Sequence, residues 1–287
     1  MSTTASGDAA FCADLVRTRD FTSYAASLFV PPGPRRAWLA LAAFHSEVSH
    51  VRDHVSQALT GEIRLQWWRD ALTGQAGATG QGDITGNPVA AELLRAIKEY
   101  RLPVETFVRL IDAHVFDVYD DPMPDIAALE AHCRDTSAAL YTLRARTLGV
   151  SSPEVVRIAD HAGIAEGVVD VMLALPRHSA RRQLYLPADL MNLHDVIAED
   201  VFMQKSDQPL REALAHLRRE ARKQLDTAFA LMGNAPAAAR PAFLPLVMVQ
   251  RTLSKLDASN PFDPPSLSRL ATLWTVWRAA SRAPFKT

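Results

Sequence analysis

Residues 162–187 read AGIAEGVVDVMLALPRHSARRQLYLP, and this stretch carries most of the information about the fold. Its first part is rich in small and apolar residues and fits a helix. Pro176 then falls inside the helical pattern, and a proline removes a backbone donor and clashes with the preceding turn. We therefore predict that the helix bends or ends near Pro176, ahead of a basic segment and the tripeptide Tyr185-Leu186-Pro187.

The rest of the chain also has a helical pattern. It shows no sustained alternation of polar and apolar residues and no Asn-Gly or Asp-Gly hairpin pair, which are the usual strand signals. Apolar residues instead recur every three or four positions, most clearly in two stripes that follow Pro103 and Pro209. The stripes are Val104, Phe107, Val108, Ile111, Val115 and Val118, and then Leu210, Leu214, Leu217, Leu225 and Leu231. The sequence predicts an all-α fold.

We expect residues 1–287 to form a single domain. Proline and glycine break the helices near residues 31–34, 121–124 and 149–153. The glycine-rich stretch at about 73–88 is the one candidate linker, but the segment before it is too short to bury a core alone. We therefore predict a surface loop there.

Charge and composition limit the possible partners and compartments. The chain has 31 Lys and Arg against 32 Asp and Glu, so no global field attracts nucleic acid. The two cysteines, Cys12 and Cys133, lack metal-ligand spacing and indicate buried or free thiols in a reducing compartment. No apolar run approaches the roughly 18 residues that span a bilayer, and residues 1–11 lack a signal-peptide pattern. We predict a cytoplasmic protein whose membrane contact is peripheral at most.

A second informative region lies earlier in the chain. Residues 40–53 read ALAAFHSEVSHVRD, and residues 61–69 read GEIRLQWWR. Together with residues 162–187, they resemble the two signature regions of squalene and phytoene synthases. The resemblance covers nearly the whole chain, and it implies an isoprenoid-synthase-type helical bundle around a central cavity.

The family resemblance also implies a chemistry, which this sequence departs from. Squalene and phytoene synthases join two prenyl diphosphates head to head, and each signature helix carries an Asp-x-x-x-Asp pair. Carboxylates four residues apart share one helix face and converge on Mg²⁺ ions, which help the diphosphate leave. Here the family pattern places these pairs at Ser49 and Asp53 and at Ala174 and His178. Three of the four carboxylates are therefore missing.

Other acidic residues offer a relocated metal site. Glu166 and Asp170 are four residues apart, one turn before the second pair, and could bind a cation together with Asp53. The alternative is that Asp170 forms a hydrogen bond in the cavity while Glu166 pairs with a nearby arginine. His50, Asp53 and His54 form a second possible ligand set, although such a helical cluster is also typical of a solvated or salt-bridged face.

The second signature region carries basic residues where the family has acidic ones. Arg177, His178, Arg181 and Arg182 form this group, and arginine side chains can bind a diphosphate or a phospholipid headgroup without metal. The alternative is that Arg181 and Arg182 form salt bridges with carboxylates such as Asp189 and only hold the loop.

These considerations give one set of candidate residues for a ligand-binding cavity. The set is Glu47, His50, Asp53, Glu166, Asp170, His178, Arg181, Arg182 and Tyr185.

The substituted positions resemble one branch of the superfamily in particular, the branch of the mitochondrial respiratory complex I assembly factor with a phytoene-synthase-like domain and its bacterial relatives. This resemblance implies a catalytically degenerate bacterial protein that binds a prenyl lipid or acts as a complex I assembly-type factor. It implies a prenyl diphosphate, a lipid or a respiratory-complex protein as partner, and no cofactor. Its place would be the cytoplasm, or the periphery of the inner membrane face.

Two alternatives remain open. The first is an active head-to-head synthase that condenses farnesyl or geranylgeranyl diphosphate, with Mg²⁺ held by Asp53, Glu166 and Asp170. The second is a lipid carrier, which would require a deep apolar cavity with Arg181 or Arg182 at its mouth.

Overall fold

The computed structural model describes residues 2–55, 57–74, 86–119, 121–257 and 259–285. Every regular element in these ranges is a helix, which confirms the predicted all-α class. The helices of the first half are α1 (Ser2–Arg19), α2 (Phe21–Ser27), α3 (Pro32–Ser49), the 3₁₀ turn η1 (Val51–His54), α4 (Ala58–Thr73), α5 (Pro88–Tyr100), α6 (Val104–Ala113) and α7 (Val115–Val118).

The second half contains the longest helices. The elements of this half are α8 (Ile126–Cys133), the π-helical turn η3 (Arg134–Ala138), α9 (Ala139–Thr147), α10 (Pro153–Leu173), α11 (Leu175–Ala180), α12 (Ala188–Leu193), α13 (Ala198–Phe202), α14 (Gln208–Met232), the 3₁₀ turn η4 (Ala237–Phe243), α15 (Leu246–Leu256) and α16 (Arg269–Ala280), of which α10 and α14 are the longest. Among the described residues, no helix is long and apolar enough to cross a bilayer.

Helix boundaries follow local chemistry. Ser152 caps α10 by accepting the backbone N–H of Val155, and Asp207 caps α14 by accepting that of Leu210. In both helices a proline occupies the first turn, where its missing N–H costs nothing. The predicted loop at 73–88 begins where α4 ends, but residues 75–85 lie outside the described part of the chain. The single-domain organisation stays a prediction.

Two predicted features of the helices can be compared with the structure. The break at Pro176 is confirmed, because α10 ends at Leu173 and α11 begins at Leu175 with the proline in its first turn. The stripe after Pro103, by contrast, is not one helix. It divides at His114 into α6 and α7.

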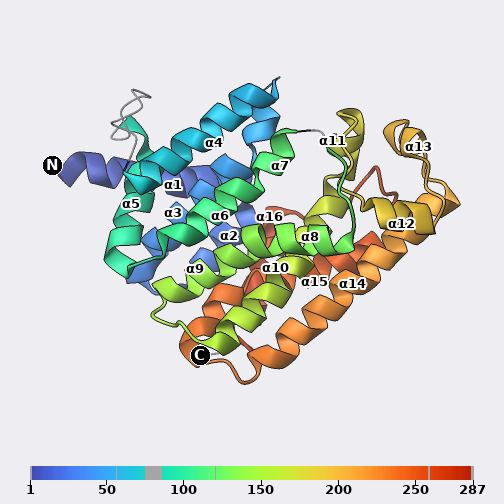
Figure 1. Ribbon diagram of the computed structural model, residues 1–287. Coiled ribbons are helices and arrows are strands. Elements are labelled where there is room, and N and C mark those ends of the chain that lie inside the picture. The colour runs from blue at the N-terminus through green and yellow to red at the C-terminus, as the bar shows by residue number, and fades with distance from the viewer. Residues whose placement is uncertain (1, 56, 75–85, 120, 258, 286–287) are drawn as a thin grey trace.

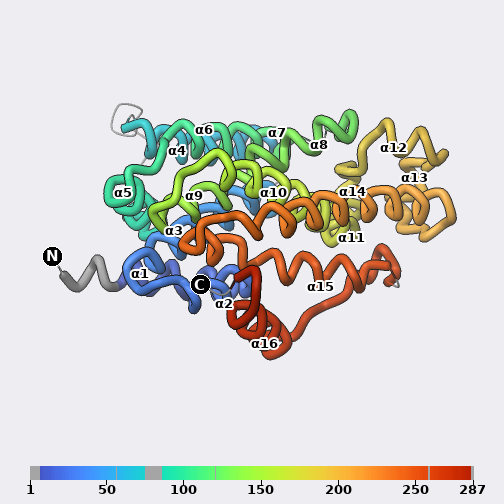
Figure 2. Tube along the Cα trace, turned by 90° about the horizontal axis from the view of Figure 1, so that it is seen from below, coloured from blue at the N-terminus to red at the C-terminus, as the bar shows by residue number. Residues whose placement is uncertain are grey.

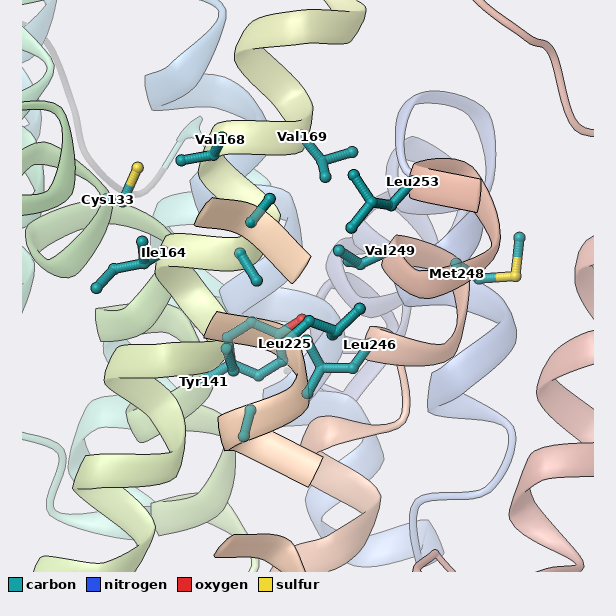
Figure 3. Packing of buried hydrophobic residues seen from close by; sticks show 14 of the residues in the cluster. Cys133, Tyr141, Ile164, Val168, Val169, Leu225, Leu246, Met248, Val249 and Leu253 are labelled. Carbon is teal, nitrogen blue, oxygen red and sulfur yellow. The ribbon is translucent and has the colours of Figure 1, made fainter. Parts of the chain in front are cut away.

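α10 lies at the centre of the bundle, between α8 and α9 on one side and α14 and α15 on the other (Figure 1, Figure 2). Apolar side chains of α10, α14 and α15 form the larger of two buried clusters. Figure 3 shows Val169 of α10 pointing toward Val249 and Leu253 of α15. The second cluster joins the apolar faces of α1, α3, α4, α5 and α6.

Two glycines bring α10 unusually close to its neighbours. A Cβ on Gly163 would lie 2.2 Å from the backbone nitrogen of Ala138 in η3, and one on Gly167 would lie 2.4 Å from Sγ of Cys133. Both distances are far below van der Waals contact, so no larger side chain fits without movement. The small residues of the opening stretch therefore allow α10 to pack directly on the α8–η3 segment.

Candidate functional site: a cavity with arginine and histidine ends

Two adjoining cavities lie beside α10. Their walls contain residues from helices of both core clusters. The small cavity has a volume of about 140 Å³ and the large cavity about 510 Å³. The two share part of their lining, which consists of His45, Ser49, Ser137, Asp170, Ala174 and Arg177.

The four positions at which the family resemblance places metal-binding aspartates, Ser49, Asp53, Ala174 and His178, all line the small cavity. Asp53 is the only acid among them, and it is paired with arginines of the second signature segment. Arg177 donates to Oδ2 of Asp53 at 3.1 Å, and Arg181 donates to Oδ1. Burial alone would raise the pKa of Asp53, but the bond to Arg181 and the charge of Arg177 hold it below its usual value.

These residues do not fit the magnesium ions that the family resemblance implies. Protein-bound Mg²⁺ takes oxygen ligands in near-octahedral geometry, usually with one or two carboxylates among them, and Ala174 and His178 supply no carboxylate. The oxygens of Asp53 already accept two guanidinium groups, whose positive charge repels a dication. A salt bridge between the two signature segments thus stands where the resemblance expects metal ions.

On α10, Glu166 is half-buried and Asp170 is exposed, and both line the large cavity. Desolvation at the cavity wall raises the pKa of Glu166 to about 7, and desolvation together with the charge of Glu166 raises the pKa of Asp170 above its usual value. The arginine whose charge acts on Glu166 is Arg144, which is itself buried. Arg144 donates to Oγ of Ser23 at 2.6 Å and stacks on the ring of Trp38.

The proposed metal ligands Asp53, Glu166 and Asp170 do not come together. In the described ranges, the set of three His, Cys or acidic side chains whose ligand atoms lie within 4.8 Å of one another is a different one, His114, Asp117 and His132. The helical set of His50, Asp53 and His54 is not such a group among the described residues either; Nδ1 of each of these two histidines bonds to a backbone carbonyl oxygen one turn earlier.

Two of the predicted cavity residues point elsewhere. Glu47 accepts a bond from Arg19 and lies in a surface groove beside Trp67. Arg182 has a positive φ of 57° and forms an ion pair with Glu199 on the surface.

The structure also changes the expected role of Asp189. The salt-bridge partners of Arg181 and Arg182 are Asp53 and Glu199. Asp189 instead accepts the backbone N–H groups of Ile126 and Leu190.

The remaining predicted residues lie at the cavity. His50 lines the large cavity, and His178, Arg181 and Tyr185 line the small one. The ring of His178 stacks on that of Tyr185 with 4.5 Å between centroids. Burial lowers the pKa of His178 to about 4, so this histidine is neutral at pH 7.

Sequence reasoning missed the residues at the inner end of the small cavity. His114 and Asp117 come from the junction of α6 and α7, and His132 comes from α8. His45 of α3 lies beside them, and burial lowers its pKa to about 3. The only sequence signal was the spacing of three residues between His114 and Asp117, which alone is too common to single out.

Asp117 is the centre of this inner end. Nδ1 of His114 lies 2.5 Å from its Oδ2, Nε2 of His132 lies 3.8 Å from its Oδ1, and the hydroxyl of Tyr185 donates to the same carboxylate. Burial would raise the pKa of Asp117, but the neighbouring histidines and Tyr185 lower it overall. Asp117 therefore carries a negative charge inside the protein.

The amino-acid sequence is similar to those of complex I assembly factors and of presqualene diphosphate synthases. Complex I assembly factor 6 of Rattus norvegicus is 34% identical over 265 residues, which are 92% of this chain and 78% of that protein. The presqualene diphosphate synthase of Rhodopseudomonas palustris is 25% identical over 214 residues, covering 74% of this chain and 75% of that enzyme.

The fold is also that of solved synthases. The squalene synthase HpnC of Alicyclobacillus acidocaldarius superposes with a TM-score of 0.74 at 22% identity, over 92% of this chain and 98% of that one. The family model for squalene/phytoene synthase matches residues 16–276. The chain therefore belongs to the squalene/phytoene synthase family.

Proposed function

We propose that this protein is a non-catalytic member of its family and acts as an assembly factor for respiratory complex I. The observation that carries the proposal is the pairing of Asp53 with Arg177 and Arg181 at the family's metal positions. Without bound Mg²⁺ the largest electrostatic contribution to diphosphate departure is missing. The relatives with over 30% identity bear the name of a complex I assembly factor, which supports the same function.

The test in the cell is deletion of the gene in the organism that encodes it. We expect NADH:quinone oxidoreductase activity of the membranes to fall and to return when the gene is restored. The double variant Asp53→Asn/Asp170→Asn, which lacks two of the proposed carboxylates, should restore activity as well as the natural gene. Unchanged activity after deletion would contradict the assembly role.

We also propose that the large cavity holds a prenyl diphosphate or a related anionic lipid without turning it over. Its volume of about 510 Å³ is within the range of small-molecule sites. Arg19 and Arg177 supply positive charge, while Leu173, Met248 and Val249 supply apolar surface. Arginine can hold the phosphate oxygens directly, so metal is not needed for binding.

Calorimetric titration with a non-hydrolysable farnesyl diphosphate analogue distinguishes this proposal from the enzyme alternative. We expect the same affinity with and without Mg²⁺, and no release of diphosphate from farnesyl diphosphate. Binding that depends on Mg²⁺, together with diphosphate release, would instead support an active synthase. Absence of binding would remove the lipid ligand but leave the assembly role intact.

For location, we propose the cytoplasm with peripheral contact at the inner membrane face. Support comes from α16, which lies at the outer edge of the bundle beside α2 (Figure 2). Trp274 and Trp277 are 60% and 51% exposed on this helix, and Leu270 is 80% exposed. Exposed tryptophans flanked by arginines, here Arg278, are typical of helices that lie in the membrane interface.

Sedimentation with vesicles tests this contact. We expect binding to vesicles that contain anionic lipid, and loss of binding in the variant Trp274→Ser/Trp277→Ser. Leu193→Ser, which removes an exposed apolar side chain on α12, is the matched control. Equal sedimentation of the tryptophan variant and the natural protein would contradict a role for α16.

A further inference from the structure

Four histidine side chains line the small cavity: His45, His114, His132 and His178. His114 and His132 flank Asp117, and the ring of His45 lies 6.1 Å from that of His114. His178 reaches the same cavity from α11. Four elements far apart in the sequence thus direct histidine side chains to one buried place.

Three of these side chains have the spacing of a metal site. One ligand atom each of His114, Asp117 and His132 lies within 4.8 Å of the other two. Two imidazole nitrogens and one carboxylate oxygen suit transition-metal dications such as Zn²⁺ and Fe²⁺, whereas Mg²⁺ prefers oxygen ligands alone. The donor set therefore differs in chemistry from the carboxylate pairs of the family.

Neighbouring groups hold the carboxylate in place. The hydroxyl of Tyr185 donates to Asp117, and the amide of Gln183 donates to its backbone carbonyl at 3.0 Å. Metal-binding carboxylates are usually oriented by such hydrogen bonds from the surrounding protein. The ion-pair partners of the Asp117 carboxylate in the described chain are histidines rather than arginine or lysine.

Two buried histidine nitrogens without hydrogen-bond partners provide a second observation in favour of a bound ligand. Nε2 of His114 and Nδ1 of His178 are buried and have no hydrogen-bond partner among the described residues. His114 is only 5% exposed, and His178 only 9%. A buried polar atom without a partner is costly, and such atoms in native proteins are commonly explained by a bound water or ion.

We propose that His114, Asp117 and His132 bind a transition-metal dication of the Zn²⁺ class at the inner end of the small cavity. Three protein ligands leave a coordination position open. His178 lines the same cavity, so this position can be filled by its imidazole or by an oxygen of a bound ligand. The proposal does not depend on a role in complex I assembly.

Titration of the chelator-treated full-length protein with Co²⁺ tests the site, because Co²⁺ bound by nitrogen and oxygen ligands has visible absorption bands. We expect bands that saturate at one equivalent and disappear when Zn²⁺ is added. Zn²⁺ should also remain with the protein at a ratio of one to one after desalting. No visible bands and no retained Zn²⁺ in the natural protein would overturn the proposal.

Variants then locate the metal. His132→Gln should weaken Co²⁺ binding at least tenfold, because one of three ligands is lost. His54→Gln is the matched control, since His54 is an exposed histidine with one bond to a backbone carbonyl and lies outside the cluster. Equal affinity in these two variants would place the metal elsewhere and overturn the assignment. Circular dichroism of both variants shows whether the fold is retained.

A variant that fails to fold does not remove the test. In the natural protein, stoichiometric Zn²⁺ should raise the unfolding temperature, because a ligand that binds the folded state stabilises it. Mg²⁺ at the same concentration should have no effect. A Zn²⁺ concentration in large excess that leaves the unfolding temperature unchanged would contradict the proposed site.

Discussion

Two carboxylates of the small cavity, Asp53 and Asp117, are both held in the charged form, but by different partners. Asp53 is paired with the guanidinium groups of Arg177 and Arg181, which stay positive at any pH the protein meets. Asp117 is surrounded by the imidazoles of His114 and His132 and by the hydroxyl of Tyr185. Imidazole can be neutral and can bind metal, whereas guanidinium cannot.

One end of this cavity thus lacks the ligands of the family's metal chemistry, while the other end offers ligands for a different metal. At Asp53 the fixed positive charge replaces the cation, so the carboxylate is neutralised permanently. At Asp117 the partners are two imidazoles and a hydroxyl, none of which carries a permanent positive charge. The small cavity therefore has one end where the carboxylate is neutralised by arginines and one end with potential metal ligands.

The largest expected effect comes from removing the inner carboxylate. Asp117→Ala should lower the free energy of unfolding by about 3–5 kcal/mol, because it leaves buried polar partners unsatisfied. Urea denaturation measures the change. Asp53→Ala, on the more exposed side, should cost about 1 kcal/mol or less. Similar losses in the two variants would remove the distinction between the two carboxylates.

Glu166 is a half-buried acid of the large cavity, and its pKa is shifted in the direction opposite to that of Asp53. The folded-state pKa of Glu166, about 7, is above that of the unfolded chain, so the folded protein binds the extra proton between roughly pH 4.5 and 7. Stability from this group is thus present below pH 4.5 and is lost as pH rises through 7, by about 3 kcal/mol in total.

The variant Glu166→Gln, which cannot ionise, should not show this loss. Relative to the natural protein it should gain stability between pH 5 and pH 8, as measured by urea denaturation at both values. Identical pH profiles of the two proteins would mean that Glu166 has an ordinary pKa.

The position of η3 beside the inner end depends on the close packing of Gly163 against Ala138. Gly163→Ala places a methyl group where Ala138 already lies, so we expect a loss of about 1–3 kcal/mol and weaker Co²⁺ binding. Gly33→Ala is the matched control, because nothing lies within 4 Å of its added methyl group. An unchanged midpoint in Gly163→Ala would show that α10 and η3 can separate at little cost.

The smallest effect is the coupling between Asp53 and Arg181. A double-mutant cycle with alanine at both positions should give about 1 kcal/mol at pH 7 and low salt, and less at high salt. Because the folded pKa of Asp53 is lowered, this contribution is present above the unfolded pKa of about 3.9 and disappears as pH falls below it. A coupling that is independent of salt would contradict the partial exposure of the pair.

Sequence patterns predicted the helical class and the break at Pro176, because spacing and proline act locally. They did not predict the break at His114, since its apolar stripe continues through the turn. That break matters to the site, because it belongs to the segment that brings His114 and Asp117 to the small cavity.

Part of the candidate site was predictable, mainly where the family resemblance supplied positions. It led to Asp53, His178 and Tyr185, which the structure places at the small cavity. Arg182 was misplaced because a left-handed backbone conformation directs it to Glu199. The histidines around Asp117 come from separate helices with no common motif, so only the tertiary structure reveals them.

The π-helical turn η3 changes the direction in which the side chains before and after it point around the helix axis. His132, Thr136, Leu140 and Arg144 follow one another at intervals of four along α8, η3 and α9, and all of them line one of the two cavities. In a regular α-helix, a step of four residues overshoots one turn by about 40°. The π-helical turn has more residues per turn, which offsets part of this overshoot of about 40°. Deleting one residue within 134–138 would therefore rotate Arg144 out of alignment with His132.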